Sequence, residues 1–259
     1  MPSTTTNLKS SVHIFLASKG GVGKTTLAAL TSEWFLNCGE SPALFDADAK
    51  NTDACLSRFE QLNATRLSDL LITNADGSEK ISETGFEKLL DSLLTEDGPH
   101  LIDTGANTYT QWMAYVSEMS LGEELEAAGK QVFVHVIAAG GEMLEESVAN
   151  MREIASKSPS QWKLVVWMNE FKSPAKMRTG EHFTQSSALK EIAPRVAGLI
   201  SMPEVSPVQR DALDQLGSLH LTAAEVKADG AISAQKRIAF GSWARKAFQG
   251  LDQVFGIGK

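Results

Sequence analysis

Residues 18 to 26 read Ser-Lys-Gly-Gly-Val-Gly-Lys-Thr-Thr, a glycine-rich run that ends in a lysine and two hydroxyl side chains. Glycines permit backbone angles in which successive N–H groups point into one concavity, and a helix that starts there adds partial positive charge. A loop of this kind holds phosphate groups. We therefore predict that residues 19 to 26 bind the polyphosphate of a nucleotide.

The positions of this loop have separate expected roles. Lys24 supplies a point charge to the β- and γ-phosphates, Thr25 gives its hydroxyl to Mg²⁺, and Thr26 reaches the α-phosphate. Ser18 stands where the usual pattern has glycine, so the loop is a variant. The backbone donors are expected from the loop interior, at Gly20, Gly21, Val22 and Gly23.

The run from Lys19 to Thr26 resembles the deviant Walker A motif of the ParA/MinD family of ATPases, whose mark is an extra lysine at the position of Lys19. In that family this lysine reaches across a nucleotide-sandwich dimer to the partner's phosphates. The resemblance implies an ATP-dependent homodimer in which Lys19 couples ATP to dimerisation. A second cation near the β–γ bridge would stabilise charge that develops in the transition state.

The resemblance continues in the segment Asp46-Ala47-Asp48-Ala49-Lys50, where the family carries its first switch. Asp48 matches the family aspartate that orients the attacking water, because a carboxylate near the γ-phosphate accepts a hydrogen bond from that water. Lys19, Lys24 and Asp48 are thus the implied catalytic residues. Ala49 and Lys50 replace the family's Pro and Gln, which leaves the rate of hydrolysis open.

Two later strand ends complete the implied site. Asp103, in His100-Leu101-Ile102-Asp103-Thr104-Gly105, resembles the family's Walker B aspartate and is expected to hold Mg²⁺ through a water ligand. The implied metal site comprises Thr25, Asp48 and Asp103. Asn169 ends a later apolar run, where relatives place an asparagine against the adenine edge, since an amide offers both a donor and an acceptor.

Three segments also resemble a plasmid-borne branch of this family, the TraL/StbB-like branch. They are residues 102 to 107 (Ile-Asp-Thr-Gly-Ala-Asn), 135 to 141 (His-Val-Ile-Ala-Ala-Gly-Gly) and 165 to 171 (Val-Val-Trp-Met-Asn-Glu-Phe). This branch implies a role in conjugative transfer, mobilisation or stability of a plasmid. The protein would act there by positioning a partner complex.

These residues need a scaffold that alternates short apolar strands with helices. The pattern predicts a doubly wound α/β fold of the P-loop type, with a mostly parallel sheet and helices on both faces, in a single domain over 1–259. The expected strands are 12–17, 43–45, 100–102, 131–138, 164–168 and 196–200. The expected helices are 24–37, 83–94, 109–117, 142–156 and 208–216.

Composition limits the classes of function. The chain of 259 residues is 42% hydrophobic and has no apolar run of the roughly 20 residues that a bilayer requires, so we expect a cytoplasmic protein. The net charge of −8 disfavours direct DNA binding. Cys38 and Cys55 are too few for a disulfide framework, and the five histidines lack metal-binding spacing.

An amphipathic helix is expected at about 231–256, where Trp243, Ala247, Leu251 and Phe255 recur at helical spacing. Such a stripe usually closes a domain core. Relatives of the MinD kind use a C-terminal amphipathic helix to touch membrane, so peripheral membrane contact is the alternative.

Three hypotheses on function follow from the sequence. The first is an ATPase whose ATP-bound form dimerises and engages a protein partner. The second is a nucleotide-dependent interaction protein with negligible hydrolysis, suggested by Ala49 and Lys50. The third is a partition or positioning ATPase that acts on DNA or membrane.

Overall fold

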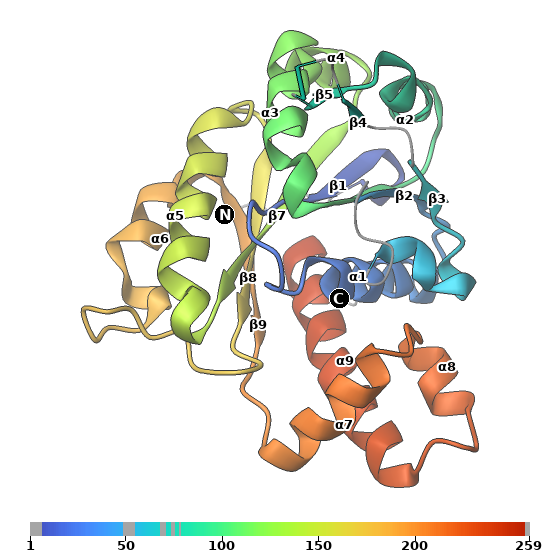
Figure 1. The fold of residues 1–259 in the computed structure, drawn as a ribbon, viewed down its shortest axis with the longest axis vertical. Coiled ribbons are helices and arrows are strands. Elements are labelled where there is room, and N and C mark those ends of the chain that lie inside the picture. The colour runs from blue at the N-terminus through green and yellow to red at the C-terminus, as the bar shows by residue number, and fades with distance from the viewer. Residues whose placement is uncertain (1–6, 49–54, 68–70, 74–75, 78, 257–259) are drawn as a thin grey trace.

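The computed structural model describes residues 7–48, 55–67, 71–73, 76–77 and 79–256 (Figure 1). Within them, one parallel sheet of seven strands forms the centre of the molecule. Its strand order is β3 (Thr65–Arg66), β2 (Ala43–Ala47), β6 (His100–Thr104), β1 (Ser11–Phe15), β7 (Gln131–Ala139), β8 (Lys163–Asn169) and β9 (Val196–Met202). The doubly wound α/β prediction is confirmed.

Each of the six expected strands is present, with ends that differ from the prediction by at most two residues. The two-residue strand β3 was not expected, because so short a segment has no readable alternation. A separate antiparallel pair, β4 (Leu71–Thr73) and β5 (Glu79–Ile81), was also not expected.

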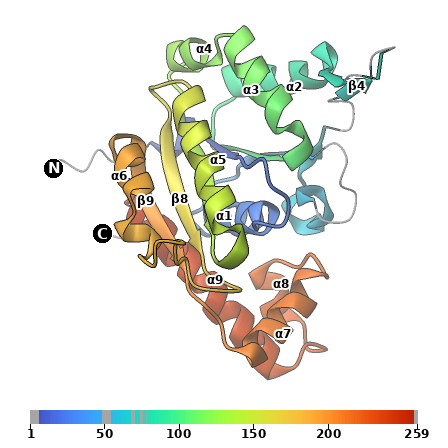
Figure 2. The same ribbon diagram turned by 60° about the vertical axis from the view of Figure 1, so that its left-hand side comes forward.

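Helices cover both faces of the sheet (Figures 1 and 2). The five expected helices lie within two residues of the predicted bounds, whereas the short helices α4, α6 and α8 were not expected. The helices are α1 (Lys24–Asn37), α2 (Glu83–Thr95), α3 (Tyr109–Glu118), α4 (Leu121–Ala127), α5 (Leu144–Lys157), α6 (Ser187–Ile192), α7 (Pro207–Gly217), α8 (Ala223–Ala228) and α9 (Ala234–Phe255).

The central strand β1 shows why two layers of helices form. Val12 and Ile14 enter one core cluster, beneath α3 and α5, while Phe15 enters the other, beneath α1 and α9. All three side chains are fully buried, as in a strand that is covered on both faces. The polar residues of a site are therefore expected in the loops that follow the carboxyl ends of the parallel strands.

Helix α9 closes the second core cluster. Ala247 and Leu251 are fully buried, and a Cβ atom at Gly250 would lie 2.4 Å from Cγ2 of Ile200 in β9. The backbone of α9 thus packs directly on the edge strand. The apolar stripe that motivated the membrane alternative lies within the core, while Arg245 and Lys246 are exposed. None of the described helices has both the length and the apolar character of a bilayer-spanning segment.

Candidate functional site

The glycine-rich loop connects β1 to α1, as the sequence predicts. Gly21 has φ +75° and Gly23 has φ +103°, backbone angles that side chains with a Cβ rarely adopt. Gly23 is the N-cap of α1, and its carbonyl accepts the N–H of Leu27 at 3.0 Å. The loop therefore leads straight into the first turn of a helix, where unpaired N–H groups favour an anion.

Lys24 lies folded back over this loop. Its side chain is 8% exposed, and Nζ donates to the carbonyl oxygen of Lys19 at 3.2 Å. Burial lowers the pKa of Lys24, while the nearby carboxylates of Asp103 and Asp48 act to raise it. The structure thus brings one lysine and two carboxylates together beside the loop.

Asp103, at the end of β6, is fully buried, and neither carboxylate oxygen meets a donor in good hydrogen-bond geometry within the described chain. Burial raises the pKa of Asp103 to about 7, although the Thr25 hydroxyl and the Lys24 ammonium act to lower it. Buried carboxylate oxygens without donors are costly. A hydrated Mg²⁺ would supply both donors and positive charge, so the donor set fits that ion.

Asp48 packs against the segment that follows Asp103. A Cβ atom at Gly105 would lie only 2.4 Å from Oδ1 of Asp48, so this position has no room for a side chain. Thr108 joins the two segments further, because its hydroxyl lies 2.9 Å from the carbonyl oxygen of Gly105 and 3.2 Å from that of Ala47. The ends of β2 and β6 are thereby held side by side, and both carboxylates lie near Lys24.

Asp46 has a structural role. Its buried carboxylate accepts the N–H of Asp48 at 3.1 Å and the N–H of Ser57 at 2.9 Å, which ties together the two ends of the segment that follows β2. Ala49 and Lys50, the substituted positions of the expected first switch, lie outside the described residues.

Asn169, at the end of β8, contacts the glycine-rich loop. Its Nδ2 donates to the carbonyl of Val22 at 3.0 Å, and its Oδ1 accepts the N–H of Phe171 at 3.3 Å. A Cβ atom at Gly23 would lie 2.9 Å from Nδ2, so glycine at this position allows the two segments to approach. The amide retains one further N–H and one lone pair for a ligand.

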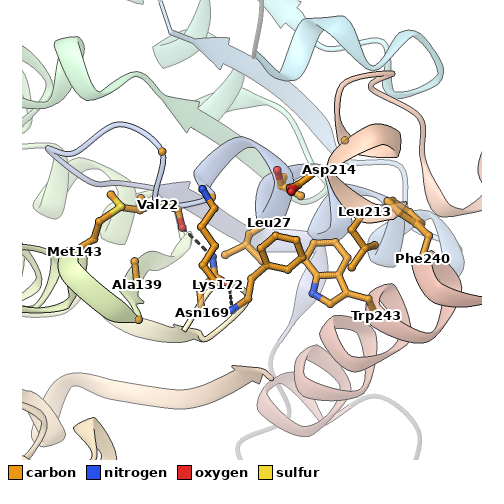
Figure 3. A pocket seen from close by; sticks show the side chains of 16 residues that line it. Val22, Leu27, Ala139, Met143, Asn169, Lys172, Leu213, Asp214, Phe240 and Trp243 are labelled. Carbon is orange, nitrogen blue, oxygen red and sulfur yellow. Dashed lines mark hydrogen bonds between the residues drawn. The ribbon is translucent and has the colours of Figure 1, made fainter. Parts of the chain in front are cut away.

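A pocket of about 300 Å³ opens beside this contact (Figure 3). The loop and Asn169 form one side, and an apolar wall forms another. Aromatic residues dominate this wall, and the rings of Phe171 and Trp243 meet edge to face with centroids 5.9 Å apart. The wall consists of Phe171, Leu213, Phe240 and Trp243, from the segment that follows β8 and from α7 and α9.

The sequence pattern does not identify these wall residues as part of a site. Trp243 belongs to the apolar stripe of the C-terminal helix. The only available signal was that a tryptophan sits at one margin of that stripe, and nothing in the spacing indicates what such a residue faces.

Lys19 stands at the beginning of the loop, and its side chain pairs with helix α5. Nζ of Lys19 is 2.9 Å from Oε2 of Glu146 on α5, and both side chains are about half exposed, at 45% and 57%. The structure therefore gathers Lys24, Thr25, Asp48 and Asp103 at one place, whereas the ammonium of Lys19 is held by α5.

Comparisons with known proteins agree with this geometry. The chain is 27% identical over 243 residues to a protein TraL of Escherichia coli, covering 93% of this chain and 97% of TraL. A second TraL from Escherichia coli is 29% identical over 192 residues, covering 74% of this chain and 76% of its own length. No protein-family model matches the chain.

Among solved structures, the MinD cell division protein of Aquifex aeolicus superimposes with a TM-score of 0.51 at 16% identity. The superposition covers 92% of this chain and 97% of MinD. At this identity the likeness concerns the fold alone, which this chain shares with MinD.

Proposed function

We propose that this chain, a relative of the TraL proteins with the ParA/MinD fold, binds ATP together with Mg²⁺ and hydrolyses it as a dimerisation switch. The observation that carries the proposal is the meeting of three groups at one loop. Lys24, the buried Asp103 and Asp48 lie close enough for the two carboxylates to act on the pKa of Lys24, directly where β1 passes into α1.

Each of these residues has a role in the proposed reaction. The amides of the glycine-rich loop and the first turn of α1 bind the phosphates, and Lys24 leaves the Lys19 carbonyl to bind the β- and γ-phosphates. Thr25 and Asp103 would hold Mg²⁺, and that ion would supply positive charge to the phosphates. Asp48 orients the attacking water, because its carboxylate is fixed against Gly105 beside Lys24.

The pocket next to the loop suits the nucleoside. Its apolar wall of Phe171, Leu213, Phe240 and Trp243 offers flat, dry contact to a base, and base–aromatic contacts contribute roughly 1–3 kcal/mol. Asn169 stands between the wall and the loop, with an amide donor and acceptor left for the edge of adenine.

The dimer and the cellular role follow from the resemblance described above. Lys19 would leave Glu146 and reach the phosphates of a second copy, and hydrolysis would return the dimer to monomers. We propose a role in conjugative transfer, mobilisation or stability of a plasmid, exercised in the cytoplasm by positioning a protein partner. The resemblance to the TraL/StbB-like branch and the similarity to TraL support this role.

The test is MgATP binding by calorimetry at millimolar ATP, followed by phosphate release with and without a partner extract. Binding with release in either condition supports the ATPase. Binding without release in either condition would favour a nucleotide-dependent interaction protein. Absence of binding would reject the proposed function.

A further inference from the structure

Helix α5 contacts the entrance of the phosphate-binding loop through two side chains that lie one helical turn apart. Oδ1 of Asn150 accepts a hydrogen bond from the backbone N–H of Ser18 at 2.9 Å. Glu146, four residues earlier on the same face, forms the ion pair with Lys19. One helix face thus contacts two successive residues at the point where the loop begins.

The two contacts differ in strength and persistence. The pair of Lys19 and Glu146 is about half exposed, so it contributes little and is screened by salt. Asn150 is 6% exposed, and its partner is a backbone amide whose position does not depend on a side-chain rotamer. A buried hydrogen bond to the backbone fixes the chain itself, so the contact of Asn150 is the firmer of the two.

Binding of a triphosphate would break another hydrogen bond of the loop, the one between Lys24 and Lys19. Lys24 closes the loop by donating to the carbonyl oxygen of Lys19. When Lys24 turns to the phosphates, that bond is lost. The bond between Asn150 and Ser18 competes with no ligand, because its acceptor lies on α5 outside the loop.

The carboxamide of Asn150 acts on the loop through its oxygen. Its Nδ2 is buried and has no hydrogen-bond partner within the described chain. Asn150 also neighbours Tyr109, the first residue of α3. Burial raises the pKa of Tyr109 to about 12, and the side chain of Asn150 acts to lower it. Helix α3 follows the segment of Asp103 and Gly105, so Asn150 lies where the loop, α5 and this segment meet.

We propose that Asn150 is a positioning residue of the phosphate-binding loop. Its Oδ1 fixes the Ser18 amide, and with it the loop entrance, so that the amides beyond Lys19 form a concavity before the triphosphate arrives. A preformed site avoids part of the ordering cost of binding. The proposal rests on the proposed function for its ligand, MgATP.

Three variants separate positioning from a merely structural role. Asn150→Leu is of similar size but removes the acceptor and leaves the Ser18 N–H unsatisfied. Asn150→Asp keeps an oxygen at the Oδ1 position, so the Ser18 N–H retains an acceptor, while the amide that acts on Tyr109 is exchanged for a carboxyl group. Val148→Ala is the matched control, because Val148 is buried on the same helix at 4% exposure and packs in the core cluster beneath α5.

The first readout is MgATP affinity by calorimetry, with thermal unfolding measured alongside. Loss of one hydrogen bond predicts that Asn150→Leu weakens ATP binding by about tenfold. Asn150→Asp should stay within about threefold of the wild type, and so should Val148→Ala despite its lower stability. ATP affinity in Asn150→Leu equal to that of the wild type would overturn the inference and leave the proposed function standing.

The second readout needs no nucleotide. Amide hydrogen exchange followed by NMR should show the Ser18 N–H exchanging at least about tenfold faster in Asn150→Leu, with protection retained in Asn150→Asp. If the wild type fails to bind ATP, the proposed function is rejected. The exchange measurement still tests whether Asn150 fixes the Ser18 amide. Unchanged exchange at Ser18 would then refute the positioning role.

Discussion

Nε1–H of Trp167 donates to Nδ1 of His135 at 2.8 Å, and this bond sets the protonation of a buried chain of side chains. An indole N–H can only donate, so the proton of His135 must lie on Nε2. His135 Nε2–H then donates to Nδ1 of His13 at 2.9 Å, and His13 Nε2–H donates to Oγ of Ser11 at 3.1 Å. The Ser11 hydroxyl ends the chain on the carbonyl of Leu8 at 2.8 Å. Both imidazoles are therefore neutral.

The two buried, neutral histidines predict that the protein loses stability in mild acid. Burial lowers the pKa of His13 from 6.5 to about 3, and burial with the neighbouring His13 lowers that of His135. The unfolded chain therefore binds more protons, so the stability that these groups contribute is complete above pH 6.5 and falls as the pH drops toward 3. Two such groups give a slope of up to about 2.7 kcal/mol per pH unit in urea unfolding.

The buried carboxyl of Asp103 acts in the opposite direction, so the test compares slopes between variants. Its pKa is raised from 3.8 to about 7, which means that its contribution to stability falls as the pH rises through that range. His13→Leu removes one histidine and leaves Asp103 unchanged. We expect its acid slope between pH 6 and 4 to be smaller by about 1.4 kcal/mol per pH unit. An unchanged slope would contradict the assignment.

The phosphate-binding loop and the strand ends could be predicted from the sequence because both are local patterns. The glycine spacing before Lys24 requires a tight turn into a helix, and α1 begins and ends at the predicted residues. Asp103 follows a short apolar run that predicts a buried strand. Its position near the carboxyl end of that strand could therefore be predicted.

The rest of the site depends on contacts between distant segments. Trp243 lines the pocket beside the loop and Asn150 bonds to Ser18, both from helices whose amphipathic pattern indicates only which face is buried. Asp46 and Asp48 lie two residues apart in one segment. The resemblance selects Asp48, but only the structure shows that Asp46 closes that segment by accepting the N–H groups of Asp48 and Ser57. The short helix α8 depends on a long-range contact as well, since Glu33 of α1 accepts two backbone N–H groups of its first turn.

Gly105→Ala should slow hydrolysis while preserving ATP binding. The new Cβ would lie 2.4 Å from Oδ1 of Asp48 and 3.0 Å from its Cα, so Asp48 must move from its position beside Lys24. A misplaced water-orienting group costs on the order of 100-fold in rate. Phosphate release under saturating MgATP measures this effect, with calorimetry for binding.

Gly241→Ala is the matched control for that substitution. A Cβ atom at Gly241 has nothing within 4 Å, and the residue lies inside α9. Alanine should stabilise this helix by up to about 1 kcal/mol and leave phosphate release unchanged. Equal turnover in Gly105→Ala and Gly241→Ala would show that Asp48 does not orient the attacking water.

Lys24→Ala should abolish ATP binding without unfolding the protein. The ammonium is costly to bury, as its lowered pKa indicates, so its removal should change the free energy of unfolding little. The loss of charged hydrogen bonds to two phosphates predicts at least about 100-fold weaker binding. Lys163→Ala, an exposed position at the start of β8, is the control for the loss of one positive charge. Equal ATP affinity in Lys24→Ala and the wild type would refute the proposed site.

Glu146→Gln should increase ATP-dependent dimerisation. In the structure the ammonium of Lys19 is engaged by Glu146, and the proposed dimer needs that ammonium at the phosphates of the second copy. Because the pair is half exposed, breaking it should change the free energy of unfolding by less than about 1 kcal/mol. It should shift the dimerisation constant in sedimentation by up to about fivefold.

The control for this substitution is Glu191→Gln, which breaks the exposed ion pair between Glu191 and Arg152 of the same helix α5. It should leave the dimerisation constant unchanged, because Arg152 does not touch the loop among the described contacts. Lys19→Ala should prevent the ATP-dependent dimer and also cancel the effect of Glu146→Gln in the double variant. Dimerisation that persists in Lys19→Ala would show that the lysine held by Glu146 does not join the two copies.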